Sequence, residues 1–484
     1  MSFLKNIVWS LINILGVQLL ALITNVILAR ILYPEVFGLL GMAMVFAGIV
    51  LVFQEAGLSS YIIYKDNITS KEAATSFWLN IIISIILSTM LFLTAKQISI
   101  FFNQPKVENI LVYISIGLFF SSMGITSRAL LTKEKKFKIL TVVDVLSEII
   151  SSILAIYFAM KNQVLISISA RLIVKPIVQS IILLIIKNKF IFNYPSKQAV
   201  YDIVPFSSKF LGSQLFVYLN NNIDYLLIGK LLGSRPLGVY TMAYQWSVLA
   251  RLYISGSINK VAFPEISSNK HDIPRVQDLF IQLIRKLSYI TFPICLGLIA
   301  ISHEFVLAIY SEKWLAAVSV LQILLISGAI TSIGTLGGAV INGLGQPQVE
   351  MKLNFFSLVS LIILILLCFP FGINVIALGI LLRTIIFDGI KVYLVAKLIN
   401  VSQKQYYKVL LPSAVSSIGM CIVIYITKQI ISVSNPLIML SILVIIGTLS
   451  YILLSFFLDK NNFKWYMKKI KKLISPFKKL TKYA

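Results

Sequence analysis

Charged residues are scarce in this sequence. They make up 13% of the 484 residues, whereas a soluble domain has about a quarter, and hydrophobic residues make up 58%. The three cysteines show no CxxC spacing, and the two histidines stand alone. We therefore expect no disulfide framework, no metal site and no cofactor. A water-soluble fold is excluded, because it could not bury this much apolar surface.

Long apolar runs fill most of the chain. A helix needs about 20 apolar residues to cross a hydrocarbon core about 30 Å thick. Continuous runs without a two-residue alternation indicate helices rather than the strands of a barrel. The sequence therefore predicts an all-α, polytopic membrane protein with about fourteen transmembrane helices, near residues 7–28, 36–53, 77–95, 107–131, 139–160, 163–186, 205–229, 237–263, 286–302, 315–342, 353–371, 374–399, 408–431 and 436–458.

Basic residues gather on one side of these predicted helices. Of the 43 Lys and Arg residues, 31 fall on the side of the two termini, eight on the opposite side and four within helices. Because Lys and Arg accumulate in cytoplasmic loops, we expect both termini in the cytoplasm of a bacterial inner membrane. The lysine-rich tail at 459–484 is expected to bind anionic membrane lipids, so the net charge of +25 does not require nucleic acid.

An internal repeat divides the chain. Residues 30–43, RILYPEVFGLLGMA, align without gaps with residues 230–243, KLLGSRPLGVYTMA, at an offset of 200. Because 200 residues contain an even number of predicted helices, the two copies would insert in the same orientation, related by an axis normal to the membrane. We predict six-helix lobes at 1–200 and 201–400, two additional helices at 401–458, and a basic cytoplasmic tail at 459–484.

The repeated segment has the pattern of a tight turn between two helices. Pro34 and Pro236 disfavour helical backbone at the residue before them, so a helix ends there and the chain reverses. Gly38 and Gly238 follow one turn into the next helix, where a missing side chain lets two helices approach closely.

The motifs ARILYPEVFG at 29–38 and DYLLIGKLLG at 224–233 resemble the polysaccharide transporter branch of the multidrug/oligosaccharidyl-lipid/polysaccharide exporter superfamily, the O-antigen, teichuronic-acid and colanic-acid type flippases. The resemblance covers essentially the whole chain. It implies a cavity between two lobes that opens alternately to each side and moves an undecaprenyl-diphosphate-linked oligosaccharide outward for lipopolysaccharide or related polysaccharide synthesis. Coupling to H+ or Na+, and association with polysaccharide polymerase and glycosyltransferase machinery, would fit this role.

Four basic residues inside predicted helices are candidates for binding the substrate diphosphate. An ionisable group there costs about 3 kcal/mol, so it tends to face a polar cavity or another charge. Arg251 and Arg383 have no acid on their own helix face. Arg171 and Lys175 share one face, because they are four residues apart, and either bind diphosphate or form salt bridges to a neighbouring helix.

Acidic residues in the same regions are candidates for ion coupling or for structural pairing. Asp144 and Glu148 share one helix face and are the possible salt-bridge partners of Arg171 and Lys175. The full set of candidate coupling residues is Asp224, Asp144, Glu148 and Asp388. Arg30 and Lys230 occupy equivalent repeat positions, and they are either interface anchors or a basic outer rim.

Two other functions compete with this interpretation. A multidrug antiporter of the same superfamily would share the fold, but its site usually needs acidic residues to attract organic cations. A membrane-bound O-antigen ligase or polymerase would use the same lipid carrier, but usually has a long outer catalytic loop. The sequence contains no Walker lysine motif and no GxSxG turn, so we expect neither an enzyme nor an ATP-driven pump.

Overall fold

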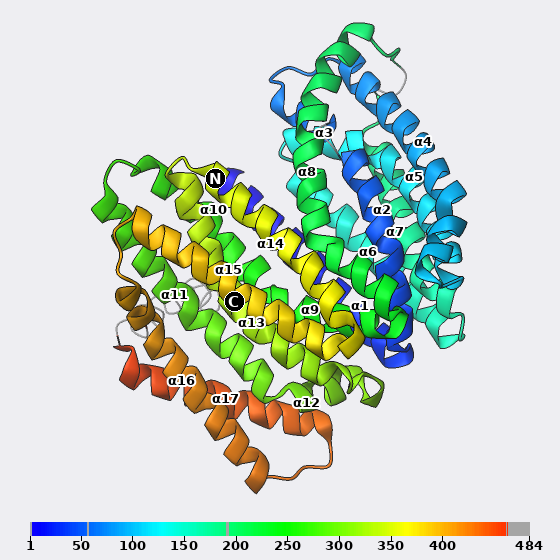
Figure 1. The fold of residues 1–484 in the computed structure, drawn as a ribbon. Helices are drawn as coiled ribbons and strands as arrows, with labels where there is room; N and C mark the ends of the chain where they lie inside the picture. The colour runs from blue at the N-terminus through cyan, green and yellow to red at the C-terminus, as the bar shows by residue number, and fades with distance from the viewer. Residues whose placement is uncertain (1, 56–57, 190–192, 461, 463–484) are drawn as a thin grey trace, which may run out of the picture. The chain divides into compact units, whose positions relative to one another are not determined.

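The computed structural model describes residues 2–55, 58–189, 193–460 and 462, and every regular element in these ranges is a helix (Figure 1). Twelve helices in this part of the chain are long and apolar enough to cross a membrane. The prediction of an all-α, polytopic membrane protein is therefore confirmed. The chain forms two compact units, residues 1–238 and 239–484, which are described separately below.

The first unit is a bundle of long helices with one short helix. Its elements are α1 (Ser2–Ile31), α2 (Pro34–Glu55), α3 (Leu58–Tyr64), α4 (Ser70–Phe102), α5 (Lys106–Lys133), α6 (Phe137–Met160), α7 (Val164–Ile186) and α8 (Lys197–Leu232). Local sequence explains several helix ends. Thr69 and Glu72 form a reciprocal capping box at the start of α4, and Asn103 ends it in the left-handed conformation.

Small residues bring the helices of this unit together. A Cβ atom on Gly117 of α5 would lie 2.3 Å from the carbonyl oxygen of Leu172 on α7, so only glycine permits this approach. Serine hydroxyls at the same interfaces bond to nearby carbonyls, as Ser180 does to Phe120 at 2.6 Å. Packing between close backbones thus replaces the hydrophobic driving force that is absent between helices in lipid.

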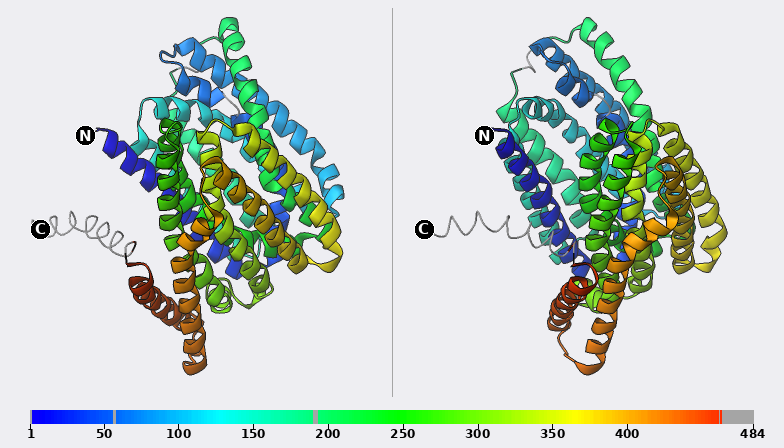
Figure 2. Two further views of the ribbon diagram at one scale, coloured as in Figure 1. Left: turned by 60° about the vertical axis from the view of Figure 1, so that its left-hand side comes forward. Right: turned by 90° about the vertical axis from the view of Figure 1, so that its left-hand side faces the viewer.

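The second unit begins within α9 (Ser234–Leu249). It continues with η1 (Ala250–Ser255, a π-helix), α10 (Gly256–Ser268), α11 (Ile273–Ala300), α12 (Ser302–Phe305), η2 (Val306–Tyr310, a π-helix), η3 (Glu312–Trp314), α13 (Ala317–Gly343), α14 (Pro347–Cys368), η4 (Phe369–Phe371), α15 (Ile373–Leu398), α16 (Gln403–Ile430) and α17 (Pro436–Leu458). Figure 2 shows α16 and α17, in orange to red, as a neighbouring pair of helices in this unit.

Two of the fourteen predicted helices differ from the other twelve. The segment predicted at 205–229 lies within the 36-residue α8, whose run Asn220 to Asn222 followed by Asp224 lowers its hydropathy. The segment predicted at 237–263 is divided among α9, η1 and α10. Both segments are helical. Neither is among the twelve helices of the described residues that are both long and apolar enough to cross a membrane, because α8 is long but too polar and the second segment is divided into short elements.

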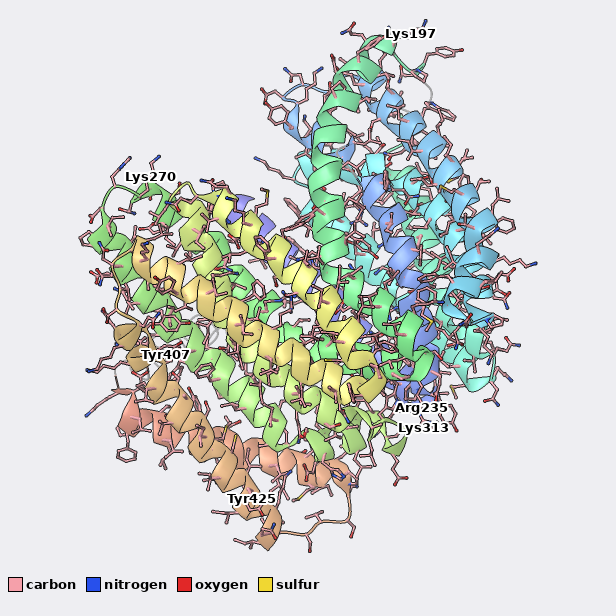
Figure 3. The ribbon with its side chains drawn as sticks, in the orientation of Figure 1. Lys197, Arg235, Lys270, Lys313, Tyr407 and Tyr425 are labelled. Atoms are coloured by element: carbon pink, nitrogen blue, oxygen red, sulfur yellow. The ribbon has the colours of Figure 1, made fainter. Side chains whose placement is uncertain are left out.

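Each unit has two distinct ends. In the first unit, Lys197 and Arg235 lie at opposite ends of α8 (Figure 3). In the second unit, Lys270 and Tyr407 lie toward one end of the bundle, and Lys313 and Tyr425 toward the other (Figure 3). Successive loops therefore lie at alternating ends of each unit, as the assignment of Lys and Arg residues to two sides assumed. Most of the tail at 459–484 lies outside the described residues.

Candidate functional site

Two arginines from different elements of the second unit line one cavity. Arg251 lies in the π-helix η1 and Arg383 in the middle of α15, and both border a cavity of about 90 Å³. Hydroxyl groups complete the polar part of its wall, from Tyr244, Ser247, Ser327, Thr331 and Thr384. The hydroxyls of Ser247, Thr331 and Thr384 donate to backbone carbonyls of their own helices, so it is the two guanidinium groups that make this wall suit an anion.

Arg251 is the less engaged of the two arginines. Its half-buried side chain makes no hydrogen bond or ion pair with the part of the chain that the structure describes. It lies in a π-helical turn, a local widening of a helix that often occurs at functional sites. No residue pattern in the sequence marks this turn.

Arg383 is held by the neighbouring helix α14. Its Nη1 donates to the backbone carbonyl of Ser357 at 3.1 Å and to the Ser357 hydroxyl at 2.7 Å. The carboxylate of Asp388 interacts electrostatically with Lys391, Arg383 and Arg251. Asp388 is therefore within electrostatic reach of three cations.

In the first unit, Glu148 holds two of the other candidate cations. Its carboxylate is fully buried and lies 2.5 Å from the Arg171 guanidinium and 2.6 Å from the Lys175 ammonium. Arg171 also donates to the side-chain oxygen of Asn25 on α1 at 2.6 Å. Arg171, Lys175 and Asn25 border a cavity of about 290 Å³. Both cations are thus paired, yet both face a cavity.

Asp144 binds a different cation from the one that the sequence pattern suggested. It pairs with Arg128 in the last two turns of α5, whose Nη1 donates to Oδ2 at 3.0 Å. Asn13 on α1 donates to the same oxygen at 2.9 Å, and Gln179 on α7 donates to Oδ1 at 3.1 Å. Sequence reasoning missed Arg128 because this residue was counted with the loop that follows α5.

The remaining candidates lie elsewhere in the first unit. Asp224 is buried in α8, where Oδ1 accepts the backbone N–H of Tyr225 at 3.0 Å. Lys230 donates to the carbonyl of Phe101 at 2.5 Å and lies 4.9 Å from the centre of the Phe101 ring. This contact fits an interface anchor. Arg30 is exposed in the last turn of α1.

The two repeated turns contact each other through their glycines. A Cβ atom on Gly38 would lie 1.7 Å from the carbonyl oxygen of Ser234, and one on Gly238 would lie 1.8 Å from that of Pro34. Beside them, Arg235 Nε lies 3.3 Å from Glu35 Oε1. The prediction that these glycines allow a close helix approach is confirmed.

An apolar cavity of about 610 Å³ lies in the second unit. Its wall comes from α11, α16 and α17 with parts of α9 and α13, and includes Leu298, Met420, Ile424, Leu443, Val444 and Ile452. Tyr289 and Tyr451 also border it, and the Tyr451 hydroxyl donates to the Tyr289 carbonyl at 2.7 Å. Such a wall suits a hydrocarbon ligand.

Two relatives are similar in sequence. The teichuronic acid biosynthesis protein TuaB of Bacillus subtilis (strain 168) is 28% identical over 309 residues, which are 63% of each chain. The lipopolysaccharide biosynthesis protein WzxC of Escherichia coli (strain K12) is 25% identical over 357 residues, which are 72% of this chain and 71% of that one. The match to the Bacillus subtilis relative thus spans just under two thirds of its length.

Solved structures show the same fold. The structure titled as the lipid II flippase MurJ in an inward closed conformation superposes with a TM-score of 0.75 at 18% identity, over 93% of this chain and 98% of that one. An inward-facing multidrug resistance transporter of the MATE family gives a TM-score of 0.61 at 17% identity, over 79% of this chain and 94% of that one. The family model described as polysaccharide biosynthesis protein matches residues 27–319, and the chain belongs to this family.

Proposed function

We propose that this protein is a flippase that moves an undecaprenyl-diphosphate-linked oligosaccharide across the bacterial cytoplasmic membrane by alternating access. The observation that carries this proposal is the convergence of Arg251 and Arg383 on one cavity. A diphosphate that leaves water without compensation loses many kcal/mol of hydration. Fixed guanidinium groups replace that hydration, and their planar forks match phosphate oxygens.

The names of the relatives support this substrate class. TuaB and WzxC are named for the biosynthesis of teichuronic acid and of lipopolysaccharide, and both are similar to most of this chain. A further relative, Agl15 of Haloferax volcanii, is named as a probable glycan biosynthesis flippase. We extend that activity to this chain, as a transporter without a catalytic step of its own.

The apolar cavity of the second unit would hold part of the polyprenyl chain. Its wall is almost entirely hydrocarbon, whereas the cavity at Arg251 and Arg383 is cationic and hydroxyl-rich. A lipid-linked glycan has a chain and a charged headgroup that need these two environments. Arg171 and Lys175 would form a second cationic surface once Glu148 no longer neutralises them.

Ion coupling would use the buried carboxylates. Glu148 is the strongest candidate, because its single charge is shared between two cations and its protonation by H+ would release both. Asp144, Asp224 and Asp388 are the other candidates for H+ or Na+.

Both termini would lie in the cytoplasm, where polymerase and glycosyltransferase machinery could associate. Arg30 would form part of a basic outer rim.

A multidrug antiporter is the competing function. The superposition with a MATE transporter shows that the fold alone does not separate the two functions. The two arginines that line the cavity separate them better, because they would repel an organic cation.

The test measures surface glycan and membrane abundance together in Arg251→Ala and Arg383→Ala cells. We expect loss of surface glycan with normal protein abundance, and no change in sensitivity to cationic drugs. If these residues only stabilised the packing of the helices, the protein itself would be lost. Normal glycan with normal abundance in both variants would remove them from the mechanism.

A further inference from the structure

A further cavity, with a largely apolar wall that carries a few polar side chains, lies at the end of the first unit that contains the repeated turn. It has a volume of about 760 Å³, within the usual range for a small-molecule site. Three segments meet around it: the turn between α1 and α2, the start of α5 and the start of α7. The charge bias of the loops predicts that this end faces outward.

The polar side chains of this cavity include both donors and acceptors. They are Tyr33, Glu35, Lys106, Tyr113 and Gln163, set beside Val36, Leu39 and the aliphatic start of α7. The side chains of Lys106, Tyr113 and Gln163 make no hydrogen bond or ion pair with any described residue. The cavity therefore presents unengaged polar groups next to two aromatic rings.

This composition differs from that of the two cavities in the second unit. The cavity at Arg251 has cations that suit phosphate, and the cavity at Met420 is hydrocarbon. Here the wall has one acid, Glu35, which Arg235 already pairs, and one base, Lys106, so it lacks the two convergent guanidinium groups of the cavity at Arg251. Tyrosine and glutamine side chains both donate and accept hydrogen bonds, which matches the hydroxyls of a sugar, and a tyrosine ring can cover the apolar face of a sugar.

We propose that this cavity binds the carbohydrate part of the substrate on the outer side of the membrane. Glu35 would connect occupancy to the repeated turns, because the same side chain borders the cavity and lies 3.3 Å from Arg235. A sugar hydroxyl that bonds to Glu35 competes with Arg235 for the carboxylate. The inference extends the proposed flippase function by naming where the glycan is held.

The test uses the full-length protein in phospholipid nanodiscs prepared with a detergent that has no sugar headgroup, because maltoside headgroups would compete. The probe is the oligosaccharide released by mild acid from the lipid-linked pool of the producing cells, and binding is measured by saturation-transfer NMR and calorimetry. We expect binding that Tyr113→Leu and Gln163→Ala each weaken by roughly 2- to 10-fold, the effect of losing one hydrogen bond.

One matched variant serves as the control. Lys96→Ala changes an exposed residue near the same end of α4 and should leave binding unchanged. The sugar site and the flippase mechanism fail separately, because the cavity variants are tested by oligosaccharide binding in nanodiscs, whereas Arg251→Ala and Arg383→Ala are tested by glycan export in cells.

Three results would overturn the sugar site. The first is no binding by a protein that supports normal glycan export. The second is equal binding by the wild type and both cavity variants. The third is labelling of the cavity by a photoreactive phospholipid that excess oligosaccharide does not reduce, because the occupant would then be membrane lipid.

Discussion

Gly38 and Gly238 occupy equivalent positions of the 200-residue repeat, and each packs against the backbone carbonyl of the other's turn. The distances are nearly equal, 1.7 Å from a Cβ on Gly38 to Ser234 O and 1.8 Å from a Cβ on Gly238 to Pro34 O. The contact therefore has its own approximate two-fold symmetry. Glu35 and Arg235 are equivalent as well, but carry opposite charges, so the symmetric contact closes with an attractive pair.

This contact should separate during transport. The proposed alternating access would part the outer ends of the lobes predicted at 1–200 and 201–400, so a covalent tie between Glu35→Cys and Arg235→Cys should stop glycan export. We would treat cells with a short bifunctional thiol reagent, after replacing Cys295, Cys368 and Cys421, and measure surface glycan. Each single-cysteine variant should export as much glycan after treatment with the reagent as before it. Normal export by the cross-linked protein would show that the turns are a fixed pivot.

Glu148 should be essential to the stability of the first unit. Glu148→Gln leaves Arg171 and Lys175 without their shared carboxylate, and breaking a buried ion pair in this way costs about 3–5 kcal/mol. We expect a several-fold fall in membrane abundance, measured by immunoblot. Adding Arg171→Gln should recover part of it. Glu265→Gln, at an exposed site, serves as the control; abundance equal to this control would contradict the structural role.

Filling the apolar cavity should block transport without unfolding the protein. Val444 borders the cavity on α17, and the neighbouring Ile445 is exposed outside its wall. We expect Val444→Trp to lower glycan export well below that of Ile445→Trp at equal abundance, because the indole occupies space needed by the polyprenyl chain. Equal export by the two tryptophan variants would argue that the lipid chain lies elsewhere.

Glu134 provides a pH-dependent link between α5 and α7. Hydrogen bonds from Lys136 and Lys187 lower the pKa of its carboxyl group. Because the pKa of Glu134 is lower in the folded state than in the unfolded state, its ionised carboxylate stabilises the fold at pH values above the unfolded-state pKa of about 4.3. This stabilisation is lost as the pH falls through the folded-state pKa. The partly exposed pair contributes at most about 1 kcal/mol. Glu134→Gln should therefore melt at a lower temperature than wild type at pH 7, with the difference vanishing once the pH has fallen below the lowered pKa of the folded state.

The helices were largely predictable because membrane helices are specified by continuous apolar runs. Two segments were harder to recognise. The polar run from Asn220 in α8 lowers its hydropathy, and the π-helix at 250–255 interrupts the next segment. A π-helix depends on tertiary packing around one turn, and no residue pattern in this sequence marks it.

Pairing between charges was only partly predictable. Helical spacing placed Arg171 and Lys175 on one face, and this allowed a shared partner to be predicted. It could not choose between Asp144 and Glu148, because that choice depends on the rotation of α6 against α5 and α7. The actual partner of Asp144, Arg128, lies on α5, and only the packed bundle brings the two together.

The most direct test of the central claim measures translocation of an undecaprenyl-diphosphate-linked oligosaccharide in proteoliposomes containing the full-length protein. Arg251→Ala and Arg383→Ala should each slow translocation by about 10- to 100-fold, because each removes a charge-assisted contact to the diphosphate. The corresponding Lys variants should retain part of the activity, since the charge survives without the fork. Wild-type rates in both Ala variants would contradict the account.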